Sequence, residues 1–240
     1  MGQDGNSSDQ GQTATLEAES NSTVPQKATG NAPRNGSGNY EPFFAIKEGV
    51  ELSYEIKNEK GEISNYTQMN IVKVIKDAEN YDITYQGVVM DNKKKPIHNN
   101  SVFIKVNIID GIVAFDNSSM LGVNMEVDME KSGDKFMLPA DLSVGDVLDD
   151  YTATLSMGPI KATTAVSNIK VVAQETIVIN GTDIECIVIE NNAATKALDM
   201  SMNDIQKTWY GRKMGIVKTK TYDSSRKQKG MQLLTFINGL

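Results

Sequence analysis

Alternation of apolar and polar side chains is the feature that most limits what this chain can fold into. Residues 52–57 and 102–108 alternate with a period of two, which is typical of half-buried β-strands. No stretch of ten residues sustains the spacing of three and four that an amphipathic helix needs. About a dozen short strands, roughly 8 to 14 residues apart, therefore predict an all-β, mainly antiparallel fold with little helix. An open or partly closed barrel, a curved sheet and a sandwich all fit this pattern.

Short turn sequences mark where consecutive strands reverse. Asp110-Gly111 and Asn180-Gly181 are typical of two-residue hairpin loops, and Asn58 to Gly61 predicts a further turn. Residues 138–150, which contain a proline and a glycine, are expected to form a loop. The strands expected after residue 57 cover 63–75, 81–90, 102–108, 112–115, 125–129, 151–156, 161–172, 174–179, 183–190, 195–202, 206–210, 215–222 and 230–237.

The first 39 residues are unlike the rest of the chain. They consist mostly of Gly, Ser, Asn, Gln and Thr, and after Met1 only Leu16 and Val24 are larger apolar side chains. These are too few to offset the entropy of ordering the backbone. We therefore expect a disordered, low-complexity tether at residues 1–39. The aromatic residues that begin at Tyr40 predict the start of a single antiparallel β domain, residues 40–240, which can bury about 70% of its unfolded surface.

Charge and cysteine content exclude several function classes. The net charge is −7 at pH 7, so the chain lacks the surplus of cations that general nucleic-acid binding requires. A single cysteine, Cys186, excludes an intrachain disulfide and a cysteine-based zinc site. No apolar run reaches the roughly 18 residues of a membrane-spanning helix. The N-terminus lacks a signal-peptide pattern, which predicts either a cytoplasmic protein or a mature form without its signal.

Three segments, taken in order along the chain, carry a resemblance to a known family. Residues 144–150 fit the pattern "vGxxLxD", and Glu175 to Ile189 fit a hairpin with Gly-Thr in its turn and one cysteine in its second strand. Residues 209–218 fit "W-Y-x-x-x-x-G-hydrophobic-V-K". Over residues 43–237 the chain resembles exported bacterial proteins of unknown function of the TapB type. It departs from that pattern at Asn180, where alanine is usual, and at Ile184, where an aromatic is usual.

The resemblance implies a curved, largely antiparallel sheet in the style of the lipoprotein-carrier proteins. It also implies export, with a lipid anchor on an N-terminal cysteine and a location in the periplasm or on the outer-membrane surface of a Gram-negative bacterium. That cysteine is absent here, as expected if this sequence begins after it. Residues 1–39 would then join the lipid to the domain. The family offers no known catalytic residues to carry over, and no cofactor is expected.

The candidate catalytic residues each have a structural interpretation. His98 is the only histidine, and it lies beside a proline and asparagines, so we expect a solvated loop residue. A Ser-His-Asp hydrolase would need it, but no Gly-x-Ser-x-Gly elbow presents a serine. Cys186 shares an apolar strand face with Ile184 and Val188, which predicts a small buried hydrophobe that reacts slowly with thiol reagents.

Asp146, Asp149 and Asp150 form the densest group of carboxylates. A glycosidase needs one of two facing carboxyls in apolar surroundings that raise its pKa, and nothing near these residues supplies them. Their spacing also differs from that of a calcium-binding loop. We expect turn-forming aspartates, no catalytic residues and no metal site.

Charge is unevenly distributed between two segments. Residues 126–150 hold eight acids and two lysines, a local charge of −6, whereas residues 207–229 hold eight bases and one acid, a local charge of +7. These segments are expected to be outward strand faces that keep the protein soluble. The alternative is that the basic segment binds an anionic glycan or a lipid headgroup. The eight bases are Lys207, Arg212, Lys213, Lys218, Lys220, Arg226, Lys227 and Lys229.

Trp209 and the methionines have two interpretations each. Trp209 is expected to anchor the core, with a groove-lining role as the alternative. Five methionines fall within forty residues, and they are expected to fill an irregular core or, alternatively, to line a ligand cavity. They are Met120, Met125, Met129, Met137 and Met157.

The sequence favours a non-enzymatic, exported or lipid-anchored protein that binds a lipid or another amphiphile on a concave apolar face. The alternative is a cell-surface interaction module that recognises glycan or a protein partner through the basic hairpin 207–229. A carboxylate-dependent hydrolase is the least favoured reading. The sequence names no binding residues.

Overall fold

The computed structural model describes residues 41–97, 101–115, 129–157 and 160–240. Within these residues it has thirteen strands and no helix, which confirms the predicted all-β, antiparallel fold. No helix in this part of the chain is long and apolar enough to cross a membrane. The strands are β1 (Glu51–Asn58), β2 (Ile63–Asp77), β3 (Asn80–Asp91), β4 (Val102–Ile109), β5 (Ile112–Phe115), β6 (Met129–Gly133), β7 (Phe136–Pro139), β8 (Tyr151–Met157), β9 (Ile160–Ile179), β10 (Thr182–Ala197), β11 (Met200–Gly211), β12 (Gly215–Asp223) and β13 (Gln228–Asn238).

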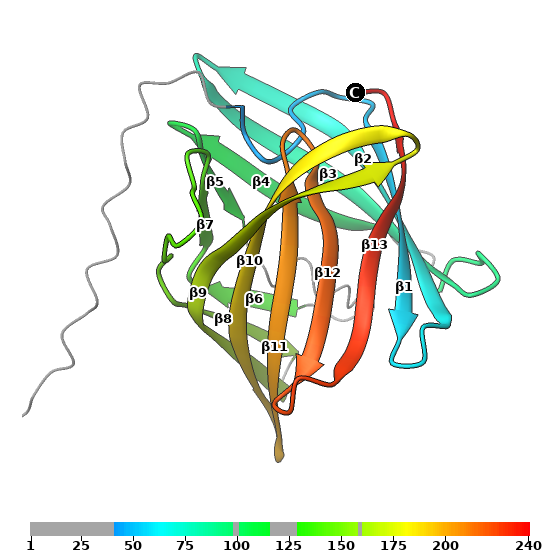
Figure 1. Cartoon of the computed structure of the whole chain (residues 1–240), viewed down its shortest axis with the longest axis vertical. Helices are drawn as coiled ribbons and strands as arrows, with labels where there is room; N and C mark the ends of the chain where they lie inside the picture. The colour runs from blue at the N-terminus through cyan, green and yellow to red at the C-terminus, as the bar shows by residue number, and fades with distance from the viewer. Residues whose placement is uncertain (1–40, 98–100, 116–128, 158–159) are drawn as a thin grey trace, which may run out of the picture.

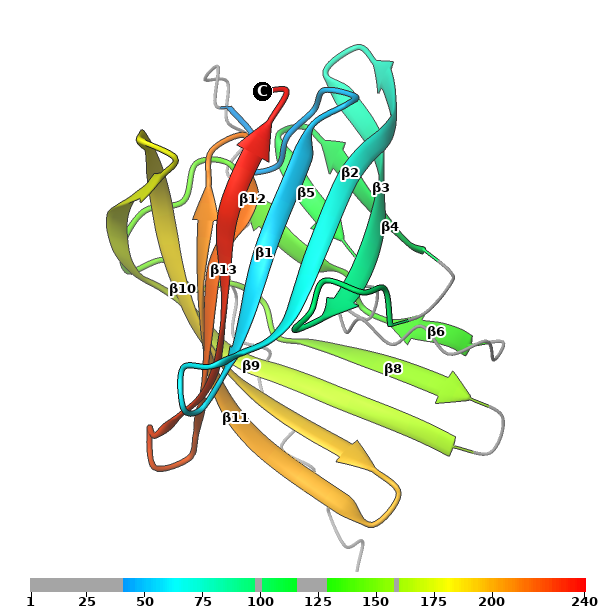
Figure 2. The ribbon, with the colours of Figure 1, turned by 90° about the vertical axis from the view of Figure 1, so that its right-hand side faces the viewer.

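All the strands belong to one sheet that curls around an interior without closing (Figures 1 and 2). The strand order is β6-β8-β9-β10-β11-β12-β13-β1-β2-β3-β4-β5-β7, so the edge strands β6 and β7 are neighbours in the chain. At most about 11 Å of extended chain separates Gly133 from Phe136. Because this link is so short, the end of β6 lies near the start of β7, although the two edge strands are not paired. The result is one curled sheet that stays open between β6 and β7.

The predicted hairpin turns are where the sequence placed them. Asp110 and Gly111 have φ values of +51° and +76°, and Asn180 and Gly181 have φ values of +50° and +77°. A positive φ at both turn residues matches the right-handed twist of the flanking strands, which is why Asp-Gly and Asn-Gly suit these positions. Asn58 also reverses the chain, because its carboxamide Oδ1 accepts hydrogen bonds from the backbone N–H groups of Lys60 and Glu62.

Two strand predictions and the start of one predicted loop differ from the structure. The run 195–202 is the end of β10 and the start of β11, with the reversal at Leu198, which has a φ of +51°. Residues 161–172 and 174–179 form one long strand, β9, because a bulge absorbs the irregularity between them. The predicted loop 138–150 begins in β7, an edge strand in which Pro139 is tolerated. The predicted strand 125–129 falls mostly outside the described residues.

The core has two layers of contact. Inside the curl, apolar side chains from β1 to β5 face those of β8 to β13. Outside it, the β9–β10 hairpin bends across β11 and β12 toward β13 (Figure 1), and β9 contacts β13. This hairpin places Ile184, Cys186 and Val188 in the core on the outer face of the sheet.

Candidate functional site

The candidate site is a cavity of about 540 Å³ inside the curled sheet. Nearly every long strand contributes to its wall, from β1 to β4 on one side and from β8 to β13 on the other. The volume falls within the range of about 300 to 1,000 Å³ that small-molecule sites have. The curl of the sheet therefore leaves a space that side chains line and do not fill.

Aromatic side chains form one end of the cavity. Phe44 packs against Phe115 with ring centres 5.2 Å apart, and Phe115 packs edge-on against Phe136 at 5.3 Å. Phe136 continues the cluster to Tyr151 at 5.5 Å and to Tyr210 at 6.2 Å. Offset and edge-on pairs at these separations add roughly 0.5 to 1.5 kcal/mol each to the apolar burial. This end is therefore firm, and Phe44 is its central side chain.

Phe44 belongs to a short segment, residues 41–45, which we call the N-terminal plug. The turn between β11 and β12 holds it, because the backbone N–H groups of Lys213 and Met214 donate to the carbonyls of Pro42 and Phe43 at 2.9 and 3.1 Å. The Lys213 ammonium also pairs with the carboxylate of Glu41. The segment predicted to begin the domain thus closes one end of the cavity.

Arg212 and Gly215 complete the seat of the plug. The Arg212 guanidinium lies 4.1 Å from the centre of the Phe43 ring and donates to the backbone carbonyls of Glu41 at 2.9 Å and Ala140 at 2.6 Å. Gly215 has a φ of +88°, and a Cβ there would lie 3.3 Å from the Phe44 ring. Residues 212–215 therefore hold the plug in place.

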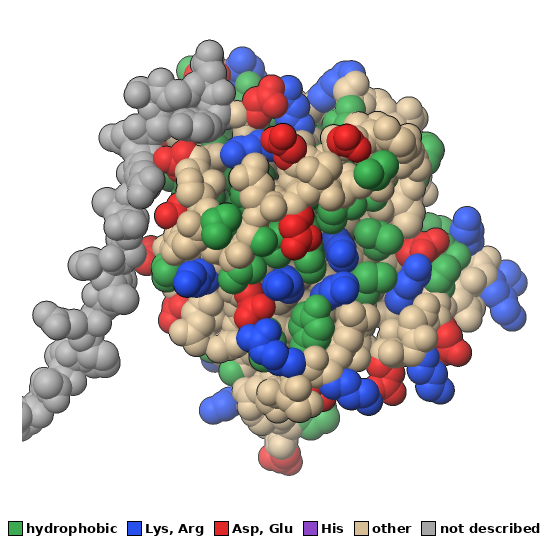
Figure 3. Space-filling model, in the orientation of Figure 1, with side chains coloured by type: hydrophobic (Ala, Val, Ile, Leu, Met, Phe, Trp, Pro, Cys, Tyr) green, Lys and Arg blue, Asp and Glu red, His purple; other side chains and the backbone are tan. Residues whose placement is uncertain are grey.

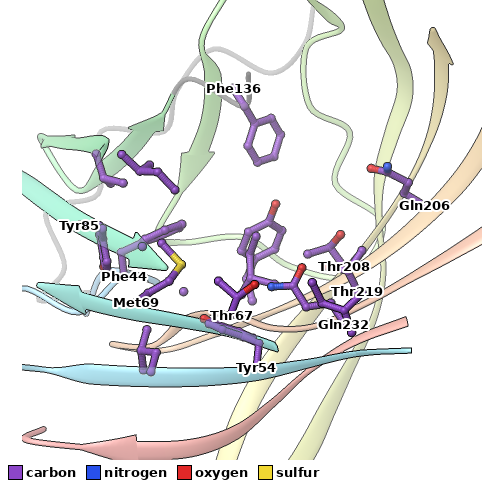
Figure 4. A pocket seen from close by; sticks show the side chains of 18 of the residues that line it. Phe44, Tyr54, Thr67, Met69, Tyr85, Phe136, Gln206, Thr208, Thr219 and Gln232 are labelled. Carbon is purple, nitrogen blue, oxygen red and sulfur yellow. The ribbon is translucent and has the colours of Figure 1, made fainter. Parts of the chain in front are cut away.

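Polar side chains line the opposite part of the cavity, on the adjacent strands β10 to β13 and on β2. We call them the polar band: Thr67, Asn191, Gln206, Thr208, Thr219 and Gln232. Gln206 pairs with Asn191 across β10 and β11, Thr208 pairs with Thr219, and Thr219 pairs with Gln232. Figure 4 shows Thr208, Thr219 and Gln232 together, with the aromatic end of the cavity on the other side. The cavity is thus amphipathic.

No charged side chain lies among the described residues that line the cavity. Burial raises the pKa of Tyr54, Tyr85 and Tyr210 well above its usual value, so the three phenols are neutral at physiological pH. The Tyr85 hydroxyl donates to the backbone carbonyl of Ala45 in the plug at 3.3 Å. The interior therefore offers apolar contact and neutral hydrogen-bonding groups, without the facing carboxylates that acid-base hydrolysis would use.

Trp209 lies on the outer face of the sheet, away from the cavity. Its neighbours Thr208 and Tyr210 point inward, while Trp209 is only 4% exposed beneath the second layer. Its indole N–H donates to the Glu175 carboxylate at 2.7 Å, and the Lys218 ammonium lies 4.4 Å from its ring centre. The predicted core anchor is confirmed, whereas the groove-lining alternative is wrong. Lys218 covers the ring instead of extending fully into solvent.

Cys186 is 1% exposed, which confirms its prediction as a small buried hydrophobe. Burial, with a contribution from the nearby Glu175 carboxylate, raises the pKa of its thiol to about 12. Asp146 accepts a hydrogen bond from the backbone N–H of Ser143 at 2.9 Å, and Asp150 accepts one from that of Asn168 at 3.0 Å. Asp146 therefore forms a turn, as predicted, whereas Asp150 joins the loop before β8 to strand β9. His98 lies outside the described residues.

Of the five methionines singled out in the sequence, only Met137 has a described side chain. It is 47% exposed on β7, so for this residue both predicted roles are wrong. Met120 and Met125 lie outside the described residues, as do residues 126–128 at the start of the acidic segment. The described part of the wall contains Met69 and Met214. The side chains of the polar band were missed as well, although one signal existed: polar residues repeat every second position in Gln206 and Thr208, in step with buried Tyr210.

The basic segment 207–229 is largely neutralised by neighbouring acids. Arg226 and Lys207 both pair with Glu190, at 2.8 and 3.9 Å. Lys227 pairs with Glu59 at 3.3 Å, and Lys229 pairs with Asp204 at 2.7 Å. Figure 3 shows cations and anions interspersed over the outer face of β9 to β13. The segment therefore forms no continuous cationic surface on this face.

One curled antiparallel sheet, a plugged end and an uncharged interior define a class of half-barrel proteins built around a cavity. The DUF3108-like family matches residues 47–234, and the chain belongs to that family. A search of curated proteins finds no match.

Two solved structures share the fold. A protein from Bacteroides fragilis that is inferred to be exported and has a YmcC-like fold aligns with a TM-score of 0.72 and 17% identity, over 83% of this chain and all of that one. An inferred lipoprotein from Parabacteroides distasonis aligns with a TM-score of 0.73 and 15% identity, over 84% of this chain and all of that one. At these identities the likeness establishes the fold alone. The narrower resemblance to the TapB type stays a prediction.

Proposed function

We propose that this protein is a non-catalytic, exported binding protein that holds a lipid or another amphiphile in its cavity. The observation that carries the proposal is the 540 Å³ interior, apolar at one end and polar but uncharged at the other. Such a space suits an amphiphile, because apolar burial supplies most of the free energy and a few polar groups fix the orientation. The names of the two structural neighbours support export, and a lipid anchor before the tether would place the cavity near a membrane.

Ligand capture by the purified full-length chain tests the proposal. Native mass spectrometry and solvent extraction should find a bound amphiphile, and a fluorescent apolar dye should bind and be displaced by added lipid. Absence of any bound or bindable ligand in all three measurements would refute the proposal.

Two adjacent alanines provide a matched pair of variants. Ala193 is buried in the cavity wall, whereas Ala194 is the next residue on β10 and points to the other face. Ala193→Phe should fill the cavity and weaken dye binding at least tenfold, while Ala194→Phe should bind as the wild type does. Equal binding by the two variants would show that the dye binds elsewhere.

The alternative, recognition of glycan or a protein partner through the basic hairpin 207–229, receives less support. Five of its eight bases are paired with carboxylates, namely Lys207, Lys213, Arg226, Lys227 and Lys229. Charge reversal of Lys218 and Lys220 followed by glycan-array binding tests this alternative, and loss of a salt-dependent signal would favour it over the cavity.

A further inference from the structure

The polarity of the cavity follows the strands in a regular way. On β11, Thr208 is followed toward the plug by Tyr210, and on β10, Asn191 is followed toward the plug by Ile189. The same step from polar to apolar occurs on three further strands: Thr67 to Met69 on β2, Thr219 to Ile216 on β12 and Gln232 to Leu234 on β13. Strand β1, between β13 and β2, contributes Leu52, Tyr54 and Ile56. The opposite wall, formed by β3 and β4, is apolar throughout. A ligand therefore has one favourable orientation, with its apolar part toward Phe44.

The hydrogen-bonding groups of the band are amides and hydroxyls. These groups both donate and accept, so they suit alcohol, ester and amide groups of a ligand. A buried ionised headgroup would need an opposite charge, and none lies among the described lining residues. The wall therefore discriminates against carboxylate, phosphate and ammonium groups at the depth of the band.

Asn191 is the buried member of the band with an unsatisfied group. It is 9% exposed, and its carboxamide Nδ2 has no hydrogen-bond partner among the described residues. A buried donor without a partner is costly, so such groups are uncommon in folded proteins. A half-turn about the Cβ–Cγ bond exchanges Nδ2 and Oδ1. As placed, Nδ2 is shielded from solvent, so it is in the exchanged orientation that a ligand oxygen in the cavity can supply the partner that the protein does not.

Resting on the proposed function, we infer that the cavity selects a neutral amphiphile, whose hydroxyl, ester or amide head lies at the polar band and accepts a hydrogen bond from Asn191. The apolar tail of the ligand lies against the aromatic end, between Phe44, Tyr210 and Phe136. A glycerol ester of a fatty acid has this chemistry, whereas a free fatty acid or a phospholipid head does not.

Three probes with the same unsaturated C18 skeleton and different heads test the inference at neutral pH. They are 1-oleoylglycerol, oleate and oleylamine, each used to displace the apolar dye from the full-length chain. The neutral ester should displace the dye at a concentration at least about tenfold lower than either charged probe, because an unpaired charge is excluded from the interior. Asn191→Leu should weaken 1-oleoylglycerol by about five- to tenfold, the loss of one hydrogen bond. The affinity of this variant for the dye is measured separately, so that its displacement values can be compared with those of the wild type.

Asn192→Leu is the matched control, because Asn192 is the next residue on β10 and is exposed. It should bind all three probes as the wild type does. Oleate or oleylamine binding as tightly as the neutral ester would overturn the inference while leaving dye capture, and thus the proposed function, intact. If a folded Asn191→Leu variant preferred 1-oleoylglycerol over the charged probes as strongly as the wild type does, Asn191 would have no part in selecting the ligand. A chain that binds no dye refutes the proposed function and this inference together.

Discussion

Gly211 offers the sharpest test of how the β11–β12 turn and the second layer fit together. This glycine lies at the end of β11 with an ordinary φ, so an alanine there meets no backbone strain. Its added Cβ would, however, lie 2.7 Å from the Cγ2 atoms of both Ile184 and Val217, and 3.3 Å from the Cβ of Met214. Ile184 and Val217 are fully buried and have little room to move. Gly211→Ala is therefore a test of overpacking alone.

The size of the effect follows from two opposing terms. Overpacking in a dense core costs about 1 to 3 kcal/mol, and contact with two buried methyl groups places this site at about 2 to 3 kcal/mol. The substitution also restricts the unfolded chain, which offsets about 0.4 to 1 kcal/mol. Gly211→Ala should therefore lower the unfolding free energy by about 1 to 2.5 kcal/mol. For a domain of this size that corresponds to a fall in Tm of about 2 to 10 °C.

Gly87 is the matched control, because it is also a strand glycine with an ordinary φ. A Cβ there meets its nearest atoms at 3.8 to 3.9 Å, which is normal van der Waals contact. Gly87→Ala should keep only the unfolded-chain term and raise Tm by about 1 to 4 °C. Urea titration monitored by circular dichroism, with the slope m unchanged, measures both variants. Shifts of Tm in the same direction for the two variants, or a Gly211→Ala variant with the stability of the wild type, would refute the overpacking at Gly211.

Three further outcomes are expected. Arg212→Ala should lower the unfolding free energy by about 1.5 to 3 kcal/mol, because the guanidinium donates to two backbone carbonyls and covers the Phe43 ring. Lys213→Ala removes only a surface ion pair and should change the unfolding free energy by less than about 0.5 kcal/mol. Urea titration measures both variants, and equal losses would contradict the role of Arg212. Cys186 should react with a chromogenic disulfide reagent only as fast as the protein unfolds, because its thiol is buried and has a pKa of about 12. Rapid reaction in native buffer would contradict that burial. The raised pKa values of Tyr54, Tyr85 and Tyr210 give stability that is complete below about pH 10 and is lost as pH rises further. Tm should therefore fall steeply above that pH, and ultraviolet titration should show these phenols ionising only when the protein unfolds. Ionisation of the phenols with Tm unchanged would argue against their burial.

Local patterns accounted for most of the strands and turns. A period of two predicts which residues pair into strands, and dipeptides such as Asp110-Gly111 and Asn180-Gly181 predict where the chain reverses, because positive φ at both positions is a local property. The turn at Leu198 escaped prediction because leucine is unusual at a positive φ and Asp199 beside it was a weaker signal than an Asp-Gly or Asn-Gly pair. The buried state of Cys186 followed from its parity with Ile184 and Val188.

The candidate site depended on relations between residues that are far apart in the sequence. The polar band joins β2 with β10 to β13, and only the register of these strands puts Asn191 beside Gln206 and Thr219 beside Gln232. The sequence likewise did not decide which face of β11 carries Trp209, because both faces have buried residues. One face lines the cavity, and the β9–β10 hairpin covers the other. Sequence alternation separates two faces but does not say what covers each.

By itself, then, the sequence determined that the chain forms an antiparallel β domain with hairpin connections and little helix, since strand periodicity and turn chemistry act within a few residues. Tertiary structure decided that the sheet curls to leave an uncharged cavity, that residues 41–45 close one end of it, and that residues 212–215 receive this plug. These features depend on twist, on register and on long-range packing between strands, which no local pattern encodes.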